Sequence, residues 1–177
     1  NEQTNFYIAS CTKSFNGLLA TILAKEGKIN LSDEITNYAP YKDFDDKSSF
    51  KNVTIMDLLS HQSGLINPYL TFRLAYSGQY EDEEILSLIE KDTHKSETGK
   101  TFSYTNLGYY LLDALFQAEL GKNWKDLLDE KIFEPLDMNT TTAYMSKTNL
   151  EEFAFPHLGA FTDSIQKAQL MKTDKIM

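Results

Sequence analysis

The chain has 177 residues, of which 41% are hydrophobic and 24% are charged, and these values are typical of a globular protein with one domain. Its formal net charge of -9 argues against nucleic acid or an anionic membrane as the main partner, and no apolar run is long enough to span a bilayer. The single cysteine, Cys11, excludes an internal disulfide.

The first strong helical pattern runs from Ser10 to Glu26, and Gly27 is suited to end it. A helix places Ser10 and Lys13 on one face, with their Cβ atoms about 5–6 Å apart. A serine hydroxyl is a weak nucleophile that needs a base nearby, and a lysine can serve if burial or a neighbouring cation lowers its pKa. The pair is therefore a candidate nucleophile and base, and the serine N–H at a helix start points toward a developing oxyanion.

The Ser-x-x-Lys pattern is weak on its own, because the chain contains it again at Ser48/Lys51 and Ser164/Lys167. On the pattern alone, the favoured interpretation of Ser10 and Lys13 is an N-cap serine followed by a surface lysine. Cys11 has no histidine with an obvious claim on it, so we interpret it as a small helix residue.

The next elements are shorter. A short helix is expected over Ser32–Tyr38, and the charged residues 41–50 are expected to form a surface loop. Thr54 and Asp57 form a capping-box pattern, with aspartate replacing the usual glutamate, ahead of a short apolar helix. His61 lies at the end of that helix, where we favour a hydrogen-bonded structural histidine over a catalytic one.

Residues 67–79 indicate a loop with about one turn of helix. Glu81–Lys91 indicates a helix, and we interpret its acidic start as a solvated first turn rather than a metal site. Residues 93–100 are expected to form a polar loop. A second strong helix should cover residues 107–120, before the stop residue Gly121.

Asn123 is expected to cap a further helix that Pro135 closes. The signal fades after Met138, so residues 143–177 are expected to form an irregular tail with one candidate helix at Asp163–Lys172. Strand signals are sparse throughout, and the predicted fold class is mainly α.

Four segments, in this order, resemble the serine beta-lactamase and penicillin-binding-protein family, in particular its branch of class C beta-lactamases, esterases and D-amino-acid peptidases. They are Ile-Ala-Ser10-Cys-Thr-Lys13-Ser-Phe, Val53-Thr-Ile-Met-Asp-Leu-Leu-Ser-His61-Gln-Ser-Gly64-Leu, Phe102-Ser-Tyr104-Thr-Asn106-Leu-Gly-Tyr and Ile132-Phe-Glu-Pro-Leu-Asp-Met138. The match covers about residues 6–142. Together the segments are far more specific than Ser-x-x-Lys alone, and they favour the catalytic interpretation.

The resemblance implies a role for each matched residue. Ser10 is the acylated nucleophile and Lys13 assists its deprotonation. Tyr104 is the general base, with a pKa that a nearby lysine ammonium would depress, and Asn106 binds substrate and holds Lys13. The substrate is a small molecule or peptide, namely a beta-lactam, a D-amino-acid peptide or an ester. No metal or organic cofactor and no nucleic acid is implied, and an extracytoplasmic or cell-envelope location is expected.

The sequence departs from the family pattern at three places. Thr98 stands where the family has proline, and Asp137 where it has glycine. The third family motif is a Lys/His-x-Gly on a late strand. His157-Leu158-Gly159 has those letters, but it follows Tyr104 too closely and lacks strand periodicity, so we expect it to lie in a loop away from the site.

The family fold packs a helical region on a mainly antiparallel sheet, and the chain lacks room for most of the flanking strands. We therefore expect residues 1–177 to be a single partial domain, with a nucleophile-bearing helical region over residues 8–142. The missing sheet would come from the remainder of the same domain or from a complementing chain. Two alternatives stay open: a penicillin-recognising receptor that does not turn over, and a non-catalytic helical interaction module.

Overall fold

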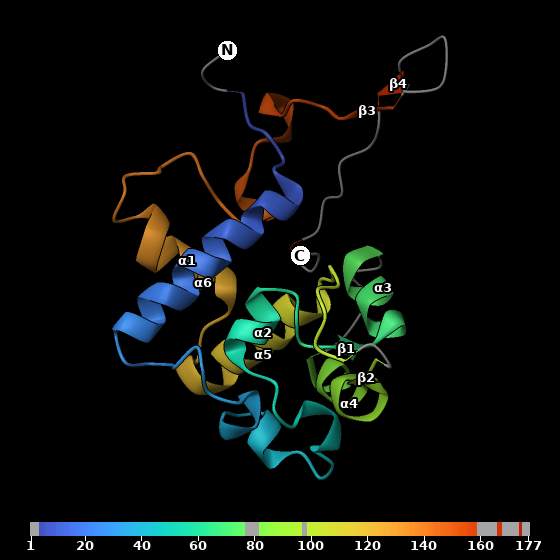
Figure 1. Ribbon diagram of the computed structural model, residues 1–177. Helices are drawn as coiled ribbons and strands as arrows, with labels where there is room; N and C mark the ends of the chain where they lie inside the picture. The colour runs from blue at the N-terminus through green and yellow to red at the C-terminus, as the bar shows by residue number, and fades with distance from the viewer. Residues whose placement is uncertain (1–3, 77–81, 97–98, 159–165, 168–173, 175–177) are drawn as a thin grey trace.

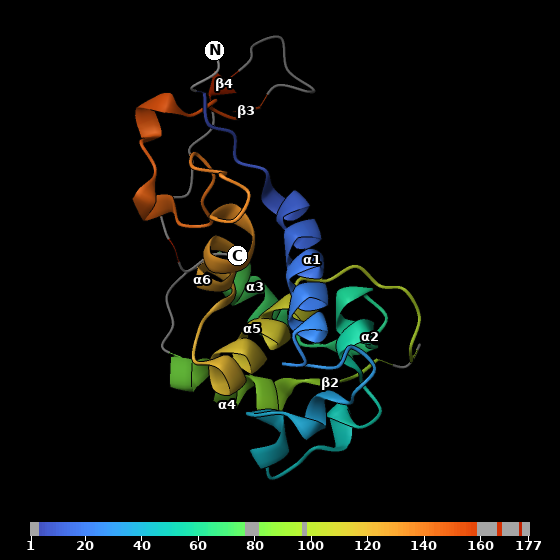
Figure 2. The same cartoon turned by 90° about the vertical axis from the view of Figure 1, so that its left-hand side faces the viewer.

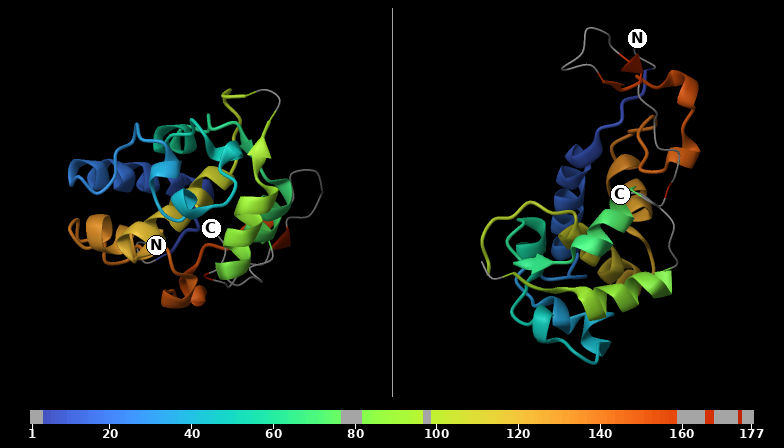
Figure 3. Two further views of the ribbon diagram at one scale, coloured as in Figure 1. Left: turned by 90° about the horizontal axis from the view of Figure 1, so that it is seen from below. Right: turned by 90° about the vertical axis from the view of Figure 1, so that its right-hand side faces the viewer.

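The computed structural model describes residues 4–76, 82–96, 99–158, 166–167 and 174, and its regular structure is mainly helical, as predicted (Figure 1). Helix α5 (Leu107–Leu120) packs against both α2 (Ile55–Leu59) and α6 (Trp124–Leu128), and α1 (Thr12–Lys25) packs against α6. Seen from below, α5 lies between α1 and α6 on one side and α3 (Pro68–Tyr76) and α4 (Asp82–Asp92) on the other (Figure 3). The candidate site residues come from the start of α1 and from the segment before α5.

The predicted first helix is present, with a tighter start than expected. A 3-10 turn, η1 (Ala9–Cys11), leads into α1 (Thr12–Lys25), which stands beside α6 in Figure 2. Gly27 has a φ of +71° just after the last turn, a conformation that costs glycine little. On its apolar face, Leu19 and Leu23 are buried and Leu18 is 46% exposed. Phe15 and Ile22 are partly buried against the core.

The segment that follows differs from its prediction. The expected helix over Ser32–Tyr38 is only a 3-10 turn, η2 (Ile35–Asn37). The expected surface loop over residues 41–50 is wrong: the turns η3 (Tyr41–Asp43) and η4 (Ser48–Phe50) carry three aromatic rings into the core. These rings, with centroids 5.3–5.6 Å apart, belong to Tyr41, Phe44 and Phe50. Their spacing in the sequence has neither a helical nor a strand period, so their burial could not be predicted from it.

The predicted capping box at the start of α2 (Ile55–Leu59) is confirmed. The Asp57 N–H donates to the Thr54 hydroxyl at 3.1 Å, and the Thr54 N–H donates to the Asp57 carboxylate at 2.8 Å. Helix α5 (Leu107–Leu120) packs closely on α2, because a Cβ at Gly108 would lie 2.8 Å from the Leu58 carbonyl oxygen. Glycine at this position therefore sets the distance between the two helices.

The segment between α2 and α5 contains more helix and strand than the sequence predicted. Helix α3 (Pro68–Tyr76) occupies most of the expected loop over residues 67–79, and α4 (Asp82–Asp92) matches its prediction. Strand β1 (Leu65–Ile66) pairs antiparallel with β2 (His94–Lys95) inside the expected loop over residues 93–100. Strands of two residues have no detectable period, which explains why neither was predicted.

Helix α6 (Trp124–Leu128) begins as predicted, with the Asn123 side chain accepting from the N–H groups of the first turn. It continues into a π-helical turn, η5 (Asp129–Phe133). Asp137 follows with a φ of +53°, a left-handed conformation that explains why the resembling family has glycine there.

The described part of the tail contains short elements: η6 (Met145–Lys147), η7 (Leu150–Glu152) and an antiparallel pair, β3 (His157–Leu158) and β4 (Gln166–Lys167). The expected last helix, Asp163–Lys172, lies mostly outside the described residues, and its two described residues form β4 instead. The loop expected at His157 is also wrong, since His157 pairs with Lys167 across the strands. Thr98, Gly159 and Ser164 lie outside the described residues.

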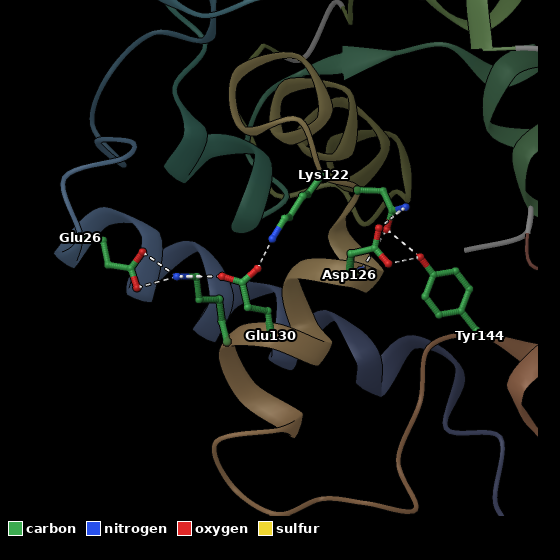
Figure 4. Close-up of polar contacts among 7 residues, drawn as sticks. Glu26, Lys122, Asp126, Glu130 and Tyr144 are labelled. Atoms are coloured by element: carbon green, nitrogen blue, oxygen red, sulfur yellow. Dashed lines mark hydrogen bonds and ion pairs between the residues drawn. The ribbon is translucent and has the colours of Figure 1, made fainter.

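A chain of exposed ion pairs connects the end of α1 to η5 (Figure 4). Lys131 bonds both oxygens of Glu26 at 3.1 Å and lies 3.3 Å from Glu130, which also pairs with Lys122. Exposed pairs of this kind each contribute only about 0–1 kcal/mol, so packing between α1 and α6 is the main connection.

Candidate active site

Ser10 lies at the centre of η1, at the point where the chain enters α1, and its side chain is exposed. Ala9, the residue before it, has a φ of +45°, which is rare for a residue with a Cβ. The Lys13 Nζ donates to the Ser10 Oγ at 3.1 Å. The structure therefore places the first predicted pair on one face of a helix start, within hydrogen-bond distance.

Tyr104 approaches the same hydroxyl from a distant part of the sequence. Its phenol oxygen lies 2.6 Å from the Ser10 Oγ, across a separation of 94 residues. The Tyr104 side chain is 55% exposed, so one side of the site is open. Ser10 thus has two hydrogen-bond partners, a lysine ammonium and a phenol.

His61 holds Tyr104 in place. Its carbonyl oxygen accepts from the Ser103 N–H at 2.9 Å, and its Nδ1 accepts from the Thr105 N–H at 3.4 Å. Its ring lies 4.5 Å from the Tyr104 ring between centroids. The residues before and after Tyr104 are therefore both tied to His61, which matches the structural role favoured from the sequence.

The turn after His61 depends on glycine. Gly64 has a φ of +66°, and a Cβ there would meet the Gly99 carbonyl oxygen at 2.5 Å. The Gly64 carbonyl accepts from the Ser96 N–H at 2.7 Å, next to the β1–β2 pair. This close crossing brings the segment that leads to Tyr104 against the end of α2.

Two tyrosine rings surround the Lys13 ammonium. Its Nζ lies 5.1 Å from the Tyr104 ring centroid and 5.3 Å from that of Tyr109. The Tyr109 hydroxyl donates to the Leu59 carbonyl at 3.0 Å, which ties this ring to the end of α2. Among the described residues, no carboxylate forms an ion pair with Lys13.

The surroundings move the pKa values of the two tyrosines in opposite directions. Interaction with Lys13, and then with Ser10, lowers the pKa of Tyr104. Burial, and then the proximity of Tyr104, raises the pKa of Tyr109. Burial, and then the charge of Lys13, lowers the pKa of His61. Opposite shifts in neighbouring groups separate their roles, and here Tyr104 is the group that ionises more readily.

Asn106 lies at the N-cap position of α5, but its side chain caps nothing. Its Oδ1 is buried and has no hydrogen-bond partner among the described residues. The hydrogen bond that we expected between Asn106 and Lys13 is therefore not formed, since the Lys13 ammonium lies on Ser10 and the tyrosine rings instead. A buried acceptor without a partner is costly, so Asn106 retains capacity for a further donor.

A cavity of about 90 Å³ adjoins these side chains. Its lining includes Ser10, Lys13, Asn16, Asn106, Tyr109 and Trp124. The Ser10 N–H donates to no described residue, so it is available to an oxyanion. The sequence had not marked Asn16, Tyr109 or Trp124 as site residues. Asn16 had a usable signal, because it is a polar residue one turn beyond Lys13 on a buried helix face.

Other residues considered from the sequence lie apart from this arrangement. His157 is exposed and forms no hydrogen bond or ion pair with Ser10, Lys13 or Tyr104. Cys11 is exposed as a free thiol. Within the described ranges, no group of three or more His, Cys, Asp or Glu residues could hold a metal ion. No described helix is long and apolar enough to cross a membrane.

Comparison with known proteins identifies related chains. A family model described as Beta-lactamase matches residues 1–154. Protein flp of Staphylococcus aureus (strain MW2) is 27% identical over 139 residues, which cover 78% of this chain and 28% of that protein. The chain thus spans less than a third of the length of this curated relative.

Two solved structures show the same architecture. D-amino acid amidase from Ochrobactrum anthropi SV3, complexed with L-phenylalanine amide, aligns with a TM-score of 0.74 and 28% identity, over 94% of this chain and 47% of that one. FmtA from Staphylococcus aureus aligns with a TM-score of 0.75 and 23% identity, over 98% of this chain and 45% of that one. The helical chain therefore corresponds to about half of each larger solved chain.

Proposed function

The chain belongs to the beta-lactamase family, and from this premise we propose that it is the nucleophile-bearing part of a serine hydrolase that works through an acyl-enzyme on Ser10. One observation supports the proposal most directly. The Ser10 Oγ lies 3.1 Å from the Lys13 Nζ and 2.6 Å from the Tyr104 phenol oxygen. An activated serine needs a base at this distance.

In the proposed acylation, the Tyr104 phenolate accepts the Ser10 proton as the Oγ bonds to the substrate carbonyl carbon. The Lys13 ammonium stabilises the phenolate, which is consistent with the lowered pKa of Tyr104. The carbonyl oxygen gains the negative charge and accepts from the Ser10 N–H. Collapse of the intermediate expels the leaving group, which takes the proton back from Tyr104, and the Asn106 amide holds the substrate.

The proposed substrate carries an acyl group in a beta-lactam, a D-amino-acid peptide or amide, or an ester. The likeness to D-amino acid amidase supports the amide and peptide classes. The same acylation without deacylation would instead make the protein a penicillin-recognising receptor. A helical interaction module would not be acylated at all, so one labelling experiment separates the three functions.

We also propose that residues 1–177 form one partial domain, with its nucleophile-bearing region over residues 8–142 and a tail over residues 143–177. The coverage of about half of each solved neighbour supports this proposal. The remainder of the domain, or a complementing chain, would complete the substrate cleft and the oxyanion hole. The proposed location is extracytoplasmic or at the cell envelope, on the family resemblance.

The test is intact-protein mass spectrometry after incubation with an activated ester or a beta-lactam probe. The longer protein or a complemented chain should gain one acyl group on Ser10, and Ser10→Ala should abolish it. Because the exposed Cys11 thiol could react with an activated ester, both forms should carry Cys11→Ala. An adduct that survives Ser10→Ala would contradict the proposal.

The isolated chain provides a second comparison. Without a second oxyanion donor, its labelling should be slower by about 10²–10³-fold. Loss of the adduct over time would indicate a hydrolase, and a permanent adduct would indicate a receptor. Rapid turnover by the isolated chain would contradict the partial-domain proposal without affecting the role of Ser10.

A further inference from the structure

Tyr109 contacts the reactive lysine but has no part in the proposed proton transfers. The Lys13 Nζ lies 5.3 Å from its ring centroid, almost as close as to the Tyr104 ring. The Tyr109 side chain is 8% exposed, and its hydroxyl is bonded to the Leu59 carbonyl at 3.0 Å. The ring is therefore fixed at the end of α2, whereas Tyr104 and Ser10 are exposed.

The described groups that face the Lys13 ammonium are Ser10, Tyr104, Tyr109 and His61. His61 lies 5.5 Å from Tyr109 and 4.5 Å from Tyr104 between ring centroids, and burial together with Lys13 lowers its pKa, which favours the neutral imidazole. No described carboxylate balances the lysine charge. Aromatic faces and the Ser10 hydroxyl are then the groups that attract the ammonium.

We propose that Tyr109 is a positioning residue whose ring face holds the Lys13 ammonium within reach of both Ser10 and Tyr104. The inference rests on the proposed function, because Ser10 and Tyr104 are taken as the reacting pair. A flexible lysine has many rotamers, and a fixed ring on one side limits them. Burial keeps the Tyr109 phenol protonated, so its ring remains neutral while Tyr104 ionises.

A purely structural role for Tyr109 predicts the opposite response at Tyr104. If Tyr109 only packs against the site, its removal admits water, which favours the charged phenolate and lowers the pKa of Tyr104 or leaves it unchanged. If Tyr109 positions Lys13, its removal releases the ammonium, and the pKa of Tyr104 rises toward its ordinary value of about 10. The sign of the change separates the two roles.

The experiment is a titration of the Tyr104 phenol by NMR, with tyrosine labelled at the ring carbon that carries the hydroxyl. We compare wild type with Tyr109→Leu, which removes the ring, and Tyr109→Phe, which keeps the ring and removes the bond to Leu59. Tyr109→Leu should raise the pKa of Tyr104, and Tyr109→Phe should change it less. A fall or no change in Tyr109→Leu would overturn the proposal.

A second variant guards against loss of folding in Tyr109→Leu. A ring-fluorinated phenylalanine at position 109 keeps the shape of phenylalanine but weakens the attraction between the ring face and a cation. Relative to Tyr109→Phe, it should also raise the pKa of Tyr104. In a Lys13→Gln background the fluorinated ring should have no such effect. The same rise with and without the lysine would contradict the proposal.

These titrations need no turnover, so they decide the role of Tyr109 even if Ser10 is never acylated. Where acylation is measurable, Tyr109→Leu should slow it by about threefold to tenfold, as expected for a cation–ring contact. The pH profile of acylation should also shift to higher pH with the pKa of Tyr104. A slower rate with an unmoved profile would assign Tyr109 a packing role.

Discussion

Two lysine–tyrosine clusters lie among the described residues, and they differ in the partner of the phenol. In one, Lys13 lies over the Tyr104 ring, and the phenol contacts the hydroxyl of Ser10. In the other, Lys147 and Lys125 lie 4.4 Å and 5.2 Å from the Tyr144 ring centroid. The Tyr144 phenol donates to the Asp126 carboxylate at 2.6 Å (Figure 4).

The pKa values of the two phenols are shifted in opposite directions. Interaction with Lys13 and then Ser10 lowers the pKa of Tyr104, whereas burial and then Asp126 raise the pKa of Tyr144 to about 12. A carboxylate that accepts a hydrogen bond from the phenol stabilises the neutral phenol, and a lysine over the ring does not reverse this effect. A lysine beside a tyrosine is therefore insufficient for a base. Burial, and then Asp126, hold Tyr144 in the neutral form, whereas no described carboxylate bonds to Tyr104.

The largest expected effect comes from removing a lysine from each cluster: Lys13 from one, and Lys147, the nearer of two, from the other. Lys13→Met should slow acylation of Ser10 by about 10²–10⁴-fold, the range for general acid–base catalysis, because Tyr104 then loses the charge that lowers its pKa. Lys147→Met is the matched control and should stay within about twofold, since it lies outside the site. Stopped-flow or quench labelling in the completed protein measures both. If Lys13→Met and Lys147→Met slowed acylation equally, the claim that only the Lys13 cluster is reactive would be contradicted.

Removal of each phenol oxygen should give a similar contrast. Tyr104→Phe should slow acylation by about 10²-fold or more, because the proposed base is lost. Tyr144→Phe should leave acylation unchanged and lower the free energy of unfolding by about 0.5–1.5 kcal/mol, through lost hydrogen bonds to Asp126 and Asn123. Labelling rates and urea unfolding test the pair. An unchanged acylation rate in Tyr104→Phe would contradict the role of Tyr104 as the base and would favour Lys13 instead.

The packing of α5 against α2, which supports the Lys13–Tyr104 cluster, can be changed by adding one methyl group. Gly108→Ala should lower the free energy of unfolding by about 1–3 kcal/mol, because the new methyl group would lie 2.8 Å from the Leu58 carbonyl oxygen. Gly17→Ala, in α1, has no atom within 4 Å of the new methyl and should raise stability by about 0.4–1 kcal/mol. Urea unfolding compares them, and a stable Gly108→Ala would show that α2 and α5 tolerate separation.

The smallest expected effect is a pH dependence of stability through His61. Burial, and then Lys13, hold its pKa below the ordinary value of about 6.5, so below that pH the unfolded chain binds a proton that the folded chain does not. This stability is present above about pH 6.5 and is lost as the pH falls through the folded pKa. In Lys13→Gln the dependence should be shallower, since one cause of the shift is gone. Urea unfolding across this pH window would contradict the account if both proteins gave the same slope.

Much of the fold could be predicted because its signals are local. The helices α1 and α5, the capping box at Thr54 and the N-cap at Asn123 all follow from apolar spacing and capping residues close in sequence. The buried aromatic cluster of η3 and η4 and the two-residue strands could not be predicted, since they have no period and depend on contacts between distant segments.

The candidate site also has a part that could be predicted from the sequence and a part that could not. The spacing of Ser10 and Lys13 follows from the helix, and the family resemblance indicated Tyr104 and Asn106. The bonds from His61 to the residues beside Tyr104 and the ring of Tyr109 beneath Lys13 depend on how α1, α2 and α5 pack. Nothing in the local sequence specifies those contacts. The family resemblance also led us to expect that Asn106 holds Lys13, and the structure does not form that bond.

The central claim is that the surroundings lower the pKa of the Tyr104 phenol and raise that of the Tyr144 phenol. A single NMR titration with ring-labelled tyrosine, assigned by Tyr104→Phe and Tyr144→Phe, measures both pKa values in the same sample. The account predicts that Tyr104 titrates below the ordinary tyrosine value of about 10 and that Tyr144 titrates at about 12. Titration of Tyr104 at or above the ordinary value, or of Tyr144 before Tyr104, would contradict it.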